Sequence, residues 1–310
     1  MKTIMEGVIP PVITPYHEDL SIDFEAYGVL LEHLVASGAH AVIVGGTTGE
    51  YYLQTTEERV QLIQKAKDVL NSRVPLIAGV GGIRTEDCIH MGLTAKSIGC
   101  DGILISSPFY AVPTQAEVAE HAIAIDEAVN LPIMLYNYPG RTGTCMESEF
   151  FNRIADRPNF QAIKESSGDI GAVHQLVLDY PQLRLFCGTD DQALEYFAWG
   201  ASGWVCGAGT ALPDEHLALY NTCIADNDFV TGRAIMKSLL PYLDFLENGG
   251  KFTQSVKYSC ELAGLPTGSV RAPLQPLSDI EKEQLAGIVQ RLKSEISELT
   301  NQKIRVAKQA

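Results

Sequence analysis

Long apolar runs and patterned cysteines are both missing from this sequence of 310 residues. No stretch reaches the roughly 18 uncharged apolar residues that a membrane-spanning helix needs, and Met1 to Glu6 lacks the apolar centre of a signal peptide. The 7 cysteines are odd in number, scattered, and without a C-x-x-C pair, which argues against a disulfide framework and a zinc ribbon. We therefore expect a soluble cytoplasmic protein.

Positive charge is also scarce. Lysine and arginine together number 23 against 38 aspartates and glutamates, and the net charge is −15. No basic stripe relieves this imbalance, so nucleic acid and anionic membrane surfaces are not expected partners. The 7 histidines include no H-E-x-x-H motif and no clustered spacing, so no metal site is predicted. An anionic substrate would need a local group of cations.

Short β-rich runs alternate with helical patterns every 25 to 30 residues or so, which is typical of repeated βα units. One helical pattern is the apolar series from Val118 to Val129. The eight expected strands are Gly7 to Pro15, Ala41 to Gly45, Pro75 to Gly79, Gly102 to Ser106, Pro132 to Asn137, Phe160 to Glu165, Leu183 to Cys187 and Gly203 to Cys206.

Eight parallel strands with intervening helices are most economically closed into a (β/α)8 TIM barrel, with an open doubly wound sheet as the alternative. We assign the barrel to residues 1–224. A C-terminal helical extension packed on the barrel would occupy residues 225–310, with helices near 228–248, 253–264 and 279–299 and a frayed end from residue 302.

Two local signals refine this prediction. Thr55 followed by Glu58 has the spacing of a capping box at the start of a helix. Pro10 and Pro11 lie within the first expected strand, where a missing N–H should interrupt the hydrogen bonding, so we expect that strand to be irregular or to start late.

Lys164 is the most informative residue. It lies in an otherwise apolar strand, where alternation places it on the same face as Phe160 and Ala162. An unpaired ammonium group on such a face costs several kcal/mol, so the lysine must pair with a carboxylate or lose its proton. A structural ion pair is one interpretation, and a nucleophilic neutral amine is the other.

Other polar residues stand at the expected strand ends, where a barrel of this type carries its catalytic groups. Thr47 and Thr48 follow the second strand and offer hydroxyls and backbone N–H groups for a carboxylate. Tyr136 ends the fifth strand and can act as a general acid and base. Arg141 follows it and can hold a second carboxylate or a hydroxyl. This set fits Schiff-base chemistry on a 2-oxo acid.

Each of these residues also has an ordinary structural interpretation. The glycine-rich turn from Gly45 to Gly49 is often a simple connector, and Tyr136 and Arg141 taken singly are compatible with packing and solvation. Asp190 and Asp191 open a helical run, so we expect them to cap it.

Other classes of function remain open. Gly188, Gly207 and Gly209 after the last two strands suit a barrel that binds phosphate or flavin, although no cation accompanies them. A ligand sensor without turnover and a divalent-metal aldolase are further alternatives.

Several motifs, taken in order, carry a resemblance. They are Gly7 with Pro10 and Thr14-Pro15, the G-T-T-G-E turn from Gly46 to Glu50, Tyr110, the Y-N-x-P-x-R-T-G run from Tyr136 to Gly143, and Ile163-Lys164-Glu165. Over nearly its whole length the chain resembles the dihydrodipicolinate synthase and N-acetylneuraminate lyase family of class I aldolases.

The resemblance implies a (β/α)8 barrel with C-terminal helices, no cofactor, and usually a homotetramer of paired dimers. It implies that Lys164 forms the Schiff base and that Tyr136, Thr48 and Tyr110 form a proton relay, with Tyr110 reaching across the dimer interface. Thr47 and Thr48 would hold the substrate carboxylate. Gly188 and Val205 complete the substrate-binding residues that we expect.

Arg141 stands where the synthase branch of the family binds the carboxylate of the second substrate. Phe109 to Pro113 lacks the polar residues usual in synthases, and Tyr51-Tyr52 replaces small residues. We expect a lyase that forms a Schiff base with pyruvate or a related 2-oxo acid and resembles dihydrodipicolinate synthase. The alternatives use the same imine: a 2-keto-3-deoxy sugar acid aldolase or dehydratase, a 4-hydroxy-2-oxoglutarate aldolase, or a pyrroline-4-hydroxy-2-carboxylate deaminase.

Overall fold

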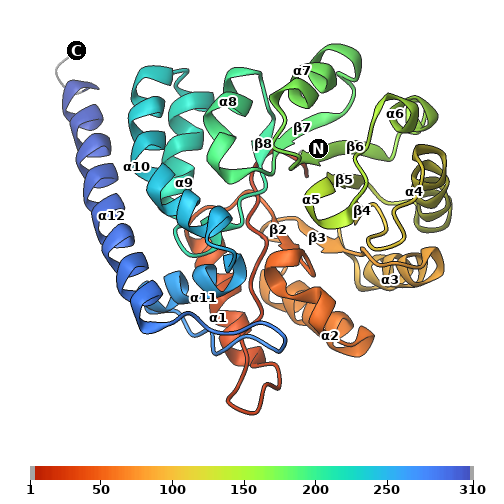
Figure 1. Cartoon of the computed structure of the whole chain (residues 1–310), viewed down its shortest axis with the longest axis horizontal. Helices are drawn as coiled ribbons and strands as arrows, with labels where there is room; N and C mark the ends of the chain where they lie inside the picture. The colour runs from red at the N-terminus through yellow and green to blue at the C-terminus, as the bar shows by residue number, and fades with distance from the viewer. Residues whose placement is uncertain (1–3, 308–310) are drawn as a thin grey trace.

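Eight parallel strands, surrounded by helices, form the centre of the computed structural model, which describes residues 4–307, with side chains through Asn301 (Figure 1). Within these residues the strands follow the order β1-β8-β7-β6-β5-β4-β3-β2. The strands are β1 (Gly7–Val8), β2 (Val42–Val44), β3 (Leu76–Gly79), β4 (Gly102–Ser106), β5 (Ile133–Asn137), β6 (Phe160–Glu165), β7 (Arg184–Cys187) and β8 (Gly203–Trp204).

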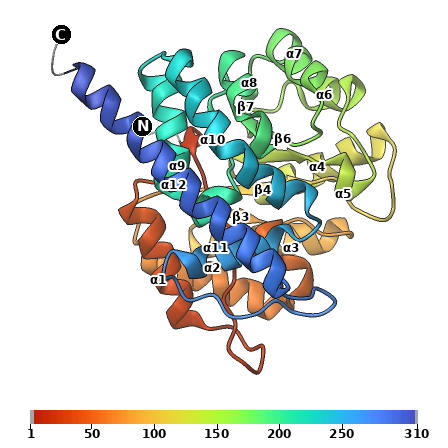
Figure 2. The ribbon, with the colours of Figure 1, turned by 60° about the vertical axis from the view of Figure 1, so that its left-hand side comes forward.

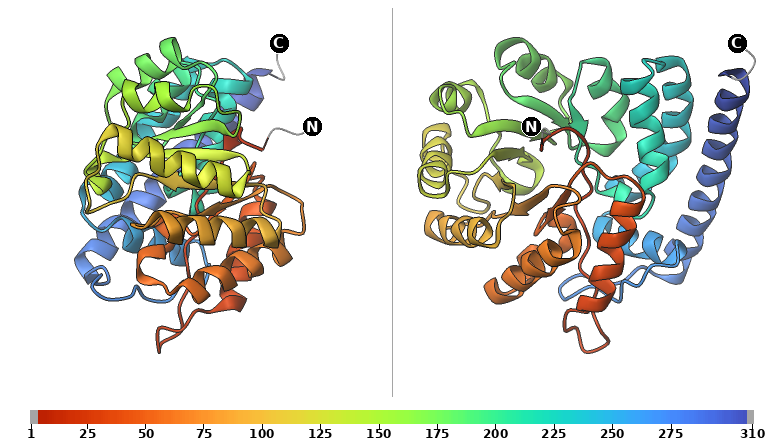
Figure 3. Two further views of the ribbon diagram at one scale, coloured as in Figure 1. Left: turned by 90° about the vertical axis from the view of Figure 1, so that its right-hand side faces the viewer. Right: turned by 180° about the vertical axis from the view of Figure 1, so that it is seen from behind.

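Helices follow the strands in a ring around them, as the view from behind also shows (Figure 3). They are α1 (Phe24–Ala36), α2 (Thr56–Leu70), α3 (Thr85–Ile98), α4 (Gln115–Val129), α5 (Pro139–Thr142), α6 (Ser148–Ile154), α7 (Ile170–Asp179), α8 (Ala193–Ala198), α9 (Pro213–Tyr220), α10 (Phe229–Asn248), α11 (Phe252–Leu262) and α12 (Asp279–Ala307). Short helical turns are η1 (Thr47–Gly49), η2 (Tyr51–Leu53), η3 (Asp190–Gln192), η4 (Ala208–Thr210) and η5 (Asn221–Ala225).

The barrel closes through the irregular first strand. The N–H of Ile43 donates to the carbonyl of Pro10 at 3.2 Å, and the N–H of Val12 donates to the carbonyl of Ile43 at 3.0 Å. Because Pro10 and Pro11 have no N–H, regular pairing stops at Val8. The predicted irregularity is confirmed, and the predicted strand through Pro15 was too long.

Two apolar cores lie on the two faces of the sheet. The outer core fills the space between strands and helices. The inner core fills the barrel itself, as expected when alternate strand residues point inward. Its buried members are Met5, Ile9, Ala41, Ile43, Ile77, Leu104, Met134, Ala162, Phe186 and Val205.

A register shift in β6 corrects one prediction. Phe160 pairs with Ile133 whereas Ala162 pairs with Met134, so Gln161 is the extra residue of a bulge. Phe160 therefore packs in the outer core while Ala162 faces the inner core. The prediction that Lys164 shares a face with Phe160 was wrong, because strict alternation does not survive a bulge.

The helices begin and end largely as local chemistry predicts. Thr55 and Glu58 form the capping box of α2, with reciprocal hydrogen bonds of 2.9 and 3.2 Å. Helix α12 continues through Ala307, beyond the expected end near residue 299, and residues 308–310 of the predicted frayed end lie outside the described part. Within that part, no helix is long and apolar enough to cross a membrane.

The C-terminal helices lie against one side of the barrel. Helix α12 runs beside α10 along the outer edge of the molecule (Figures 1 and 2). The end of α10 and the start of α11 reach the rim of the barrel, where Glu247, Asn248 and Phe252 line a cavity together with residues that follow the strands.

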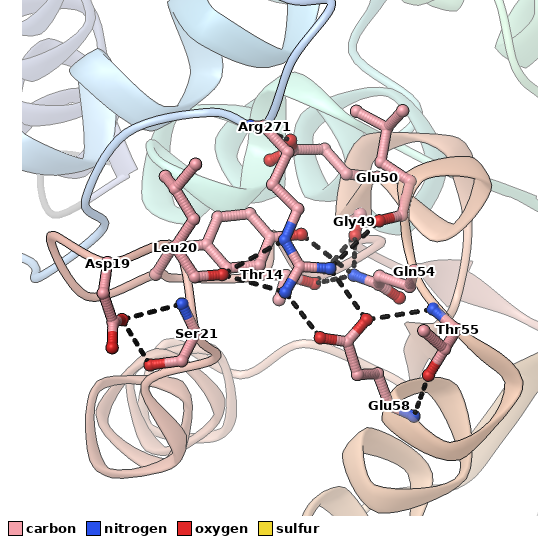
Figure 4. Close-up of polar contacts among 12 residues, drawn as sticks. Thr14, Asp19, Leu20, Ser21, Gly49, Glu50, Gln54, Thr55, Glu58 and Arg271 are labelled. Atoms are coloured by element: carbon pink, nitrogen blue, oxygen red, sulfur yellow. Dashed lines mark hydrogen bonds and ion pairs between the residues drawn. The ribbon is translucent and has the colours of Figure 1, made fainter.

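Charged residues connect α11 and the segment after it to the loop after β2 and to α2 (Figure 4). Arg271 forms an ion pair with Glu58, and its backbone N–H donates to Glu50 at 3.2 Å. Lys257 forms a second ion pair with Glu50 at 2.7 Å. Glu50 is fully buried and adopts a φ of +61°, a conformation that few residues other than glycine tolerate. The loop that carries Thr47 and Thr48 is thus fixed from outside the barrel.

Candidate active site

A cavity of about 320 Å³ lies at the carboxyl ends of the strands. This is the end at which TIM barrels carry their catalytic groups. The structure brings seven of the eight predicted site residues to its wall. They are Thr47, Thr48, Tyr136, Arg141, Lys164, Gly188 and Val205.

Lys164 lies near the end of β6, in register with Tyr136 on β5 and Phe186 on β7. Its side chain is buried, and within residues 4–301 it forms no ion pair. The other deeply buried lysine, Lys257, has its carboxylate partner at 2.7 Å. The interpretation of Lys164 as one half of a structural ion pair is therefore not supported.

Burial lowers the pKa of Lys164, because a charged amine loses solvation in this position. The carboxylates of Asp190 and Glu247 raise the pKa of Lys164, but to a smaller extent than burial lowers it. The balance favours a larger fraction of neutral amine than a free lysine has near pH 7, and the neutral amine is the form that attacks a carbonyl.

Tyr136 provides a phenol beside this amine. The Nζ atom of Lys164 lies 4.2 Å from the centre of its ring. Burial raises the pKa of Tyr136, so its hydroxyl keeps its proton, while a side-chain hydrogen bond with Thr47 acts in the opposite direction. A protonated phenol beside a neutral amine is suited to transfer protons during reactions of a carbonyl group.

Glycines make room for these groups. A Cβ atom on Gly188 would lie 2.7 Å from Cγ of Lys164 and 2.0 Å from Oγ of Ser166. A Cβ atom on Gly79 would lie 2.2 Å from the carbonyl oxygen of Gly45. The first glycine leaves space for the lysine, and the second allows the turn with Thr47 and Thr48 to approach β3.

Arg141 lies on α5, directly after β5. Its Cζ atom is 5.3 Å from the centre of the Tyr138 ring, a distance at which guanidinium groups interact with aromatic faces. It forms no ion pair with any side chain in the described part of the chain, so its charge is available to an anionic ligand.

A second cavity of about 280 Å³ adjoins the first, and the two share Thr47, Tyr136, Tyr138 and Arg141. Tyr51, Tyr52, Leu104 and Phe109 give this second space aromatic and apolar walls.

Tyr110 is the predicted site residue that the fold does not bring into either cavity. Its side chain is 91% exposed and its φ is +67°. The single chain therefore does not contain the predicted contact between Tyr110 and the other members of the proton relay.

Asp190 has a different role from the capping that the sequence predicted. Its carboxylate accepts hydrogen bonds from Nε1 of Trp204 at 2.8 Å and from the N–H of Ala208 at 3.1 Å. Burial raises its pKa to about 6. The capping prediction for Asp190 was wrong, because its donors are Trp204 at the end of β8 and the N–H of Ala208 beyond it, and neither belongs to the helical turn that Asp190 opens.

Glu247 was missed by sequence reasoning. It belongs to the last turn of α10 and lines the cavity that contains Lys164. Burial is the first cause that raises its pKa to about 8, and the nearby Asp190 is the second. One feature of the sequence could have indicated Glu247. A negative charge in the last turn of a helix is unfavourable because of the helix dipole, so an acidic residue there suggests a role other than stabilising the helix.

The acidic residues of the cavity do not gather around a metal position. Among the residues that the structure describes, no three or more His, Cys, Asp or Glu side chains are grouped so that they could hold a metal ion. The reactive groups of the cavity are the lysine, the phenol and the hydroxyl groups.

Comparison with known proteins agrees with this geometry. The sequence pattern of the Dihydrodipicolinate synthetase family matches residues 4–292. The chain is 37% identical to the 4-hydroxy-tetrahydrodipicolinate synthase of Exiguobacterium sibiricum, over 87% of this chain and 92% of that one. It is 33% identical to the enzyme of the same name from Bacillus subtilis, over 92% of this chain and 99% of that one.

Solved structures agree as well. The 4-hydroxy-tetrahydrodipicolinate synthase of Methylacidiphilum fumariolicum superposes with a TM-score of 0.89 at 29% identity, over 96% of this chain and 99% of that one. The predicted barrel with C-terminal helices and the predicted resemblance are both confirmed. The chain belongs to the dihydrodipicolinate synthetase family.

Proposed function

We propose that this protein is a class I lyase that forms a Schiff base between Lys164 and pyruvate or a related 2-oxo acid. The observation that carries this proposal is the position of Lys164. It is buried, it has no ion pair within the described side chains, and it lies against Tyr136 in the cavity at the barrel mouth. Lyase chemistry of this kind also agrees with the family to which the chain belongs.

The residues divide the work as follows. The neutral amine of Lys164 attacks the keto carbon, and the oxygen takes a proton from Tyr136 as a carbinolamine forms. The nitrogen returns a proton to Tyr136, which donates it to the carbinolamine hydroxyl, so that water leaves and the iminium ion forms. Thr47 and Thr48 bind the substrate carboxylate through hydroxyl and backbone N–H groups. The iminium withdraws electrons from the neighbouring carbon, which loses a proton to the phenolate of Tyr136 and becomes part of an enamine. The enamine attacks the carbonyl carbon of the aldehyde, and the aldehyde oxygen takes a proton as the carbon–carbon bond forms; cleavage is the reverse.

The second substrate occupies the space between the imine and the rim of the barrel. The relatives of this chain are named as synthases, and we infer that the reaction is a condensation of the bound 2-oxo acid with an aldehyde. Arg141 stands between the two cavities and can bind an anionic group of that aldehyde. Tyr51 and Tyr52 add two aromatic rings to the wall of the second cavity. The second substrate should therefore differ in shape from a substrate that fits a site with small residues at these positions.

The exposed Tyr110 supports a further part of the proposal. A tyrosine that is 91% exposed at a φ of +67° is costly unless something holds it. We infer that Tyr110 enters the site of a second copy in a dimer, and that two dimers form a tetramer. The 7 free thiols suit a reducing compartment, which supports a cytoplasmic location.

Borohydride trapping tests the central step. Wild-type protein treated with pyruvate and sodium borohydride should gain one reduced pyruvyl group per chain on the peptide that contains Lys164. Lys164→Ala should gain none. Lys257 is an internal control, because it is also buried but ion-paired, and it should stay unmodified. A wild-type protein that is not labelled would contradict the proposed function. A panel of 2-oxo acids and aldehydes, followed by pyruvate consumption or release, then identifies the reaction.

A further inference from the structure

Two polar residues directly follow the reactive lysine and phenol in the chain. Asn137 comes after Tyr136 at the end of β5, and Glu165 comes after Lys164 at the end of β6. The two strands are parallel, and their register makes Asn137 and Glu165 the next pair across them. Alternation turns these two side chains away from the barrel interior. Both are buried, Asn137 with 1% and Glu165 with 0% exposure.

A carboxylate buried at this position needs hydrogen-bond donors, and two are present. Nδ2 of Asn137 donates to Oε2 of Glu165 at 2.7 Å, and the backbone N–H of Ser167 donates to Oε1 at 2.6 Å. Within residues 4–301, Glu165 forms no ion pair with a lysine, arginine or histidine. Neutral donors therefore hold this carboxylate, and each of its oxygens accepts one hydrogen bond.

The amide of Asn137 has one favoured orientation. Its Oδ1 accepts a hydrogen bond from the N–H of Met146 at 2.9 Å, so Nδ2 has to face Glu165. Met146 follows α5, the helix that carries Arg141. A single amide thus joins the end of β5 to the end of β6 and to the segment after α5.

Glu165 in turn fixes the start of the loop after β6. Its side chain holds the N–H of Ser167, and Ser167 and Gly168 line the cavity that contains Lys164. Its backbone carbonyl accepts hydrogen bonds from the N–H of Gly188 at 2.8 Å and from the hydroxyl of Tyr196 at 3.2 Å. The residue directly after the lysine is therefore held through both its side chain and its backbone.

The side chain of Lys164 has no such polar support. Within residues 4–301 it forms no ion pair, and its amine lies against the ring of Tyr136. The strand ends must therefore set the relative position of the amine and the phenol. Displacement of a reacting group by about 1 Å can reduce a rate about 100-fold, so contacts that fix the strand ends bear on the reaction.

We propose that Asn137 and Glu165 are positioning residues for the Schiff-base step, and that their hydrogen bond holds the ends of β5 and β6 so that the phenol and the amine keep their separation. The proposal rests on the function proposed above. Neither residue touches the substrate, because both side chains lie on the outer face of the strands and act through the neighbouring residue in the chain.

An exchange of donor and acceptor tests this role. In Glu165→Gln one buried NH2 group has to face another donor, because both partners of Glu165 are donors. In Asn137→Asp two carboxyl groups face each other. The double variant Asn137→Asp/Glu165→Gln restores the hydrogen bond with its direction reversed, while the N–H groups of Met146 and Ser167 keep their acceptors.

Borohydride trapping is measured over a range of pyruvate concentrations with borohydride in excess, and urea unfolding is measured for each variant. Glu165→Gln should lower the trapping rate at saturating pyruvate about tenfold or more, because the amine and the phenol are displaced. The pyruvate concentration for half of the maximal rate should change by less than about threefold, because Thr47 and Thr48 follow a different strand. Asn137→Asp should also be slow, whereas the double variant should return to within about threefold of the wild-type rate.

Asp126→Asn is the matched control. Asp126 is a buried carboxylate on α4 that accepts hydrogen bonds from Nδ2 of Asn159 at 2.7 Å and from Arg157 at 2.8 Å. Asn159 directly precedes β6, so this network lies at the opposite end of the strand from Glu165. Asp126→Asn should unfold at a lower urea concentration than the wild-type protein but trap pyruvate at the wild-type maximal rate.

The inference and the proposed function fail in different ways. If borohydride does not trap pyruvate on the wild-type protein, both fail. If pyruvate is trapped, the proposed function stands. The inference is then overturned by a wild-type maximal rate in Glu165→Gln, by a double variant that is no faster than Glu165→Gln, or by an equal loss of rate in Asp126→Asn. Should Glu165→Gln not fold, Asn137→Ala removes the same hydrogen bond, and an unchanged maximal rate in that variant would overturn the inference.

Discussion

Lys164 and Tyr136 pair in register across β6 and β5, and the Nζ atom of the lysine lies 4.2 Å from the centre of the tyrosine ring. Lys164 is buried and Tyr136 is partly buried. Burial shifts their pKa values in opposite directions, lowering that of the amine and raising that of the phenol. Near neutral pH these shifts favour an amine without its proton beside a phenol that keeps its own.

Tyr136→Phe should preserve the fold, because the ring that contacts Lys164 remains. Loss of the hydroxyl removes the proposed acid and base, so kcat should fall on the order of 100- to 10,000-fold. Steady-state kinetics with pyruvate and an accepted aldehyde measures this. Tyr27→Phe removes a buried hydroxyl from α1, far from the cavity, and should leave kcat within about twofold. Equal kcat values for the two variants would contradict the role of Tyr136.

The pH dependence of pyruvate trapping should report the protonation state of Lys164. The neutral amine reacts, so the initial rate should rise with pH and level off below the ordinary lysine value of 10.5, because burial lowers the pKa of Lys164. Asp190, Glu247, Tyr138 and Cys187 are the groups whose charges oppose this shift.

Glu247→Gln removes one of those charges. It should move the midpoint of the same profile to lower pH, because a negative charge that favours the protonated amine is lost. Asp190→Asn should act in the same direction, but it also disturbs the hydrogen bonds to Trp204 and Ala208, so Glu247→Gln is the cleaner variant. A midpoint that moves to higher pH would refute this electrostatic account.

Gly188→Ala should displace the lysine. The added methyl group would meet Cγ of Lys164 at 2.7 Å and Oγ of Ser166 at 2.0 Å. Overpacking of this kind lowers the free energy of unfolding by about 1–3 kcal/mol, and displacement of a reacting group by about 1 Å reduces rates about 100-fold. Trapping rates and urea unfolding measure the two effects.

Gly287→Ala is the control for that substitution. Gly287 lies within α12, and a Cβ atom there meets no atom within 4 Å. Alanine is the better helix former by up to about 1 kcal/mol, so this variant should be slightly more stable and should trap pyruvate at the wild-type rate. If Gly188→Ala behaves like Gly287→Ala, the steric argument is wrong.

The ion pair between Arg271 and Glu58 should stabilise the protein measurably. Their side chains are 17% and 24% exposed, and Arg271 also donates to the carbonyls of Leu20 and Leu53. A double-mutant cycle with Arg271→Met and Glu58→Gln should give a coupling energy of about 1–3 kcal/mol in urea unfolding.

The pair formed by Arg153 and Glu149 is the control for this cycle. It lies on the surface, with side chains 42% and 57% exposed, and should give only a few tenths of a kcal/mol. Similar coupling energies for the two pairs would show that Arg271 is an ordinary surface residue.

The sequence predicts the central strands well because their signals are local. Strands β4 and β6 have the predicted boundaries, and both are apolar runs that turn residues border on at least one side. The bulge at Gln161 could not be predicted, since it depends on how β5 and β6 fit together. For the same reason Phe160 was assigned to the wrong face.

The candidate site was predictable where its residues follow strands. Lys164, Tyr136, Thr47 and Thr48 end strands of one parallel barrel, so topology alone brings them together. Glu247 comes from a helix whose direction relative to the barrel no local pattern specifies. Asp190 was misassigned because its donors, Trp204 and Ala208, follow it in the chain by 14 and 18 residues.

During synthesis of the chain, the contacts of Arg271 can form only after the barrel strands have been made. Its N–H bonds Glu50 across a sequence separation of 221 residues. The ribosome synthesises the turn with Thr47 and Thr48 early and Arg271 late. A nascent chain that has emerged only through β8 would therefore contain every strand and Lys164. The turn with Thr47 and Thr48 would still lack its contact with Arg271. Premature termination before residue 271 should therefore leave the turn with Thr47 and Thr48 without its contact to Arg271, and it would also remove the core residues that α12 supplies.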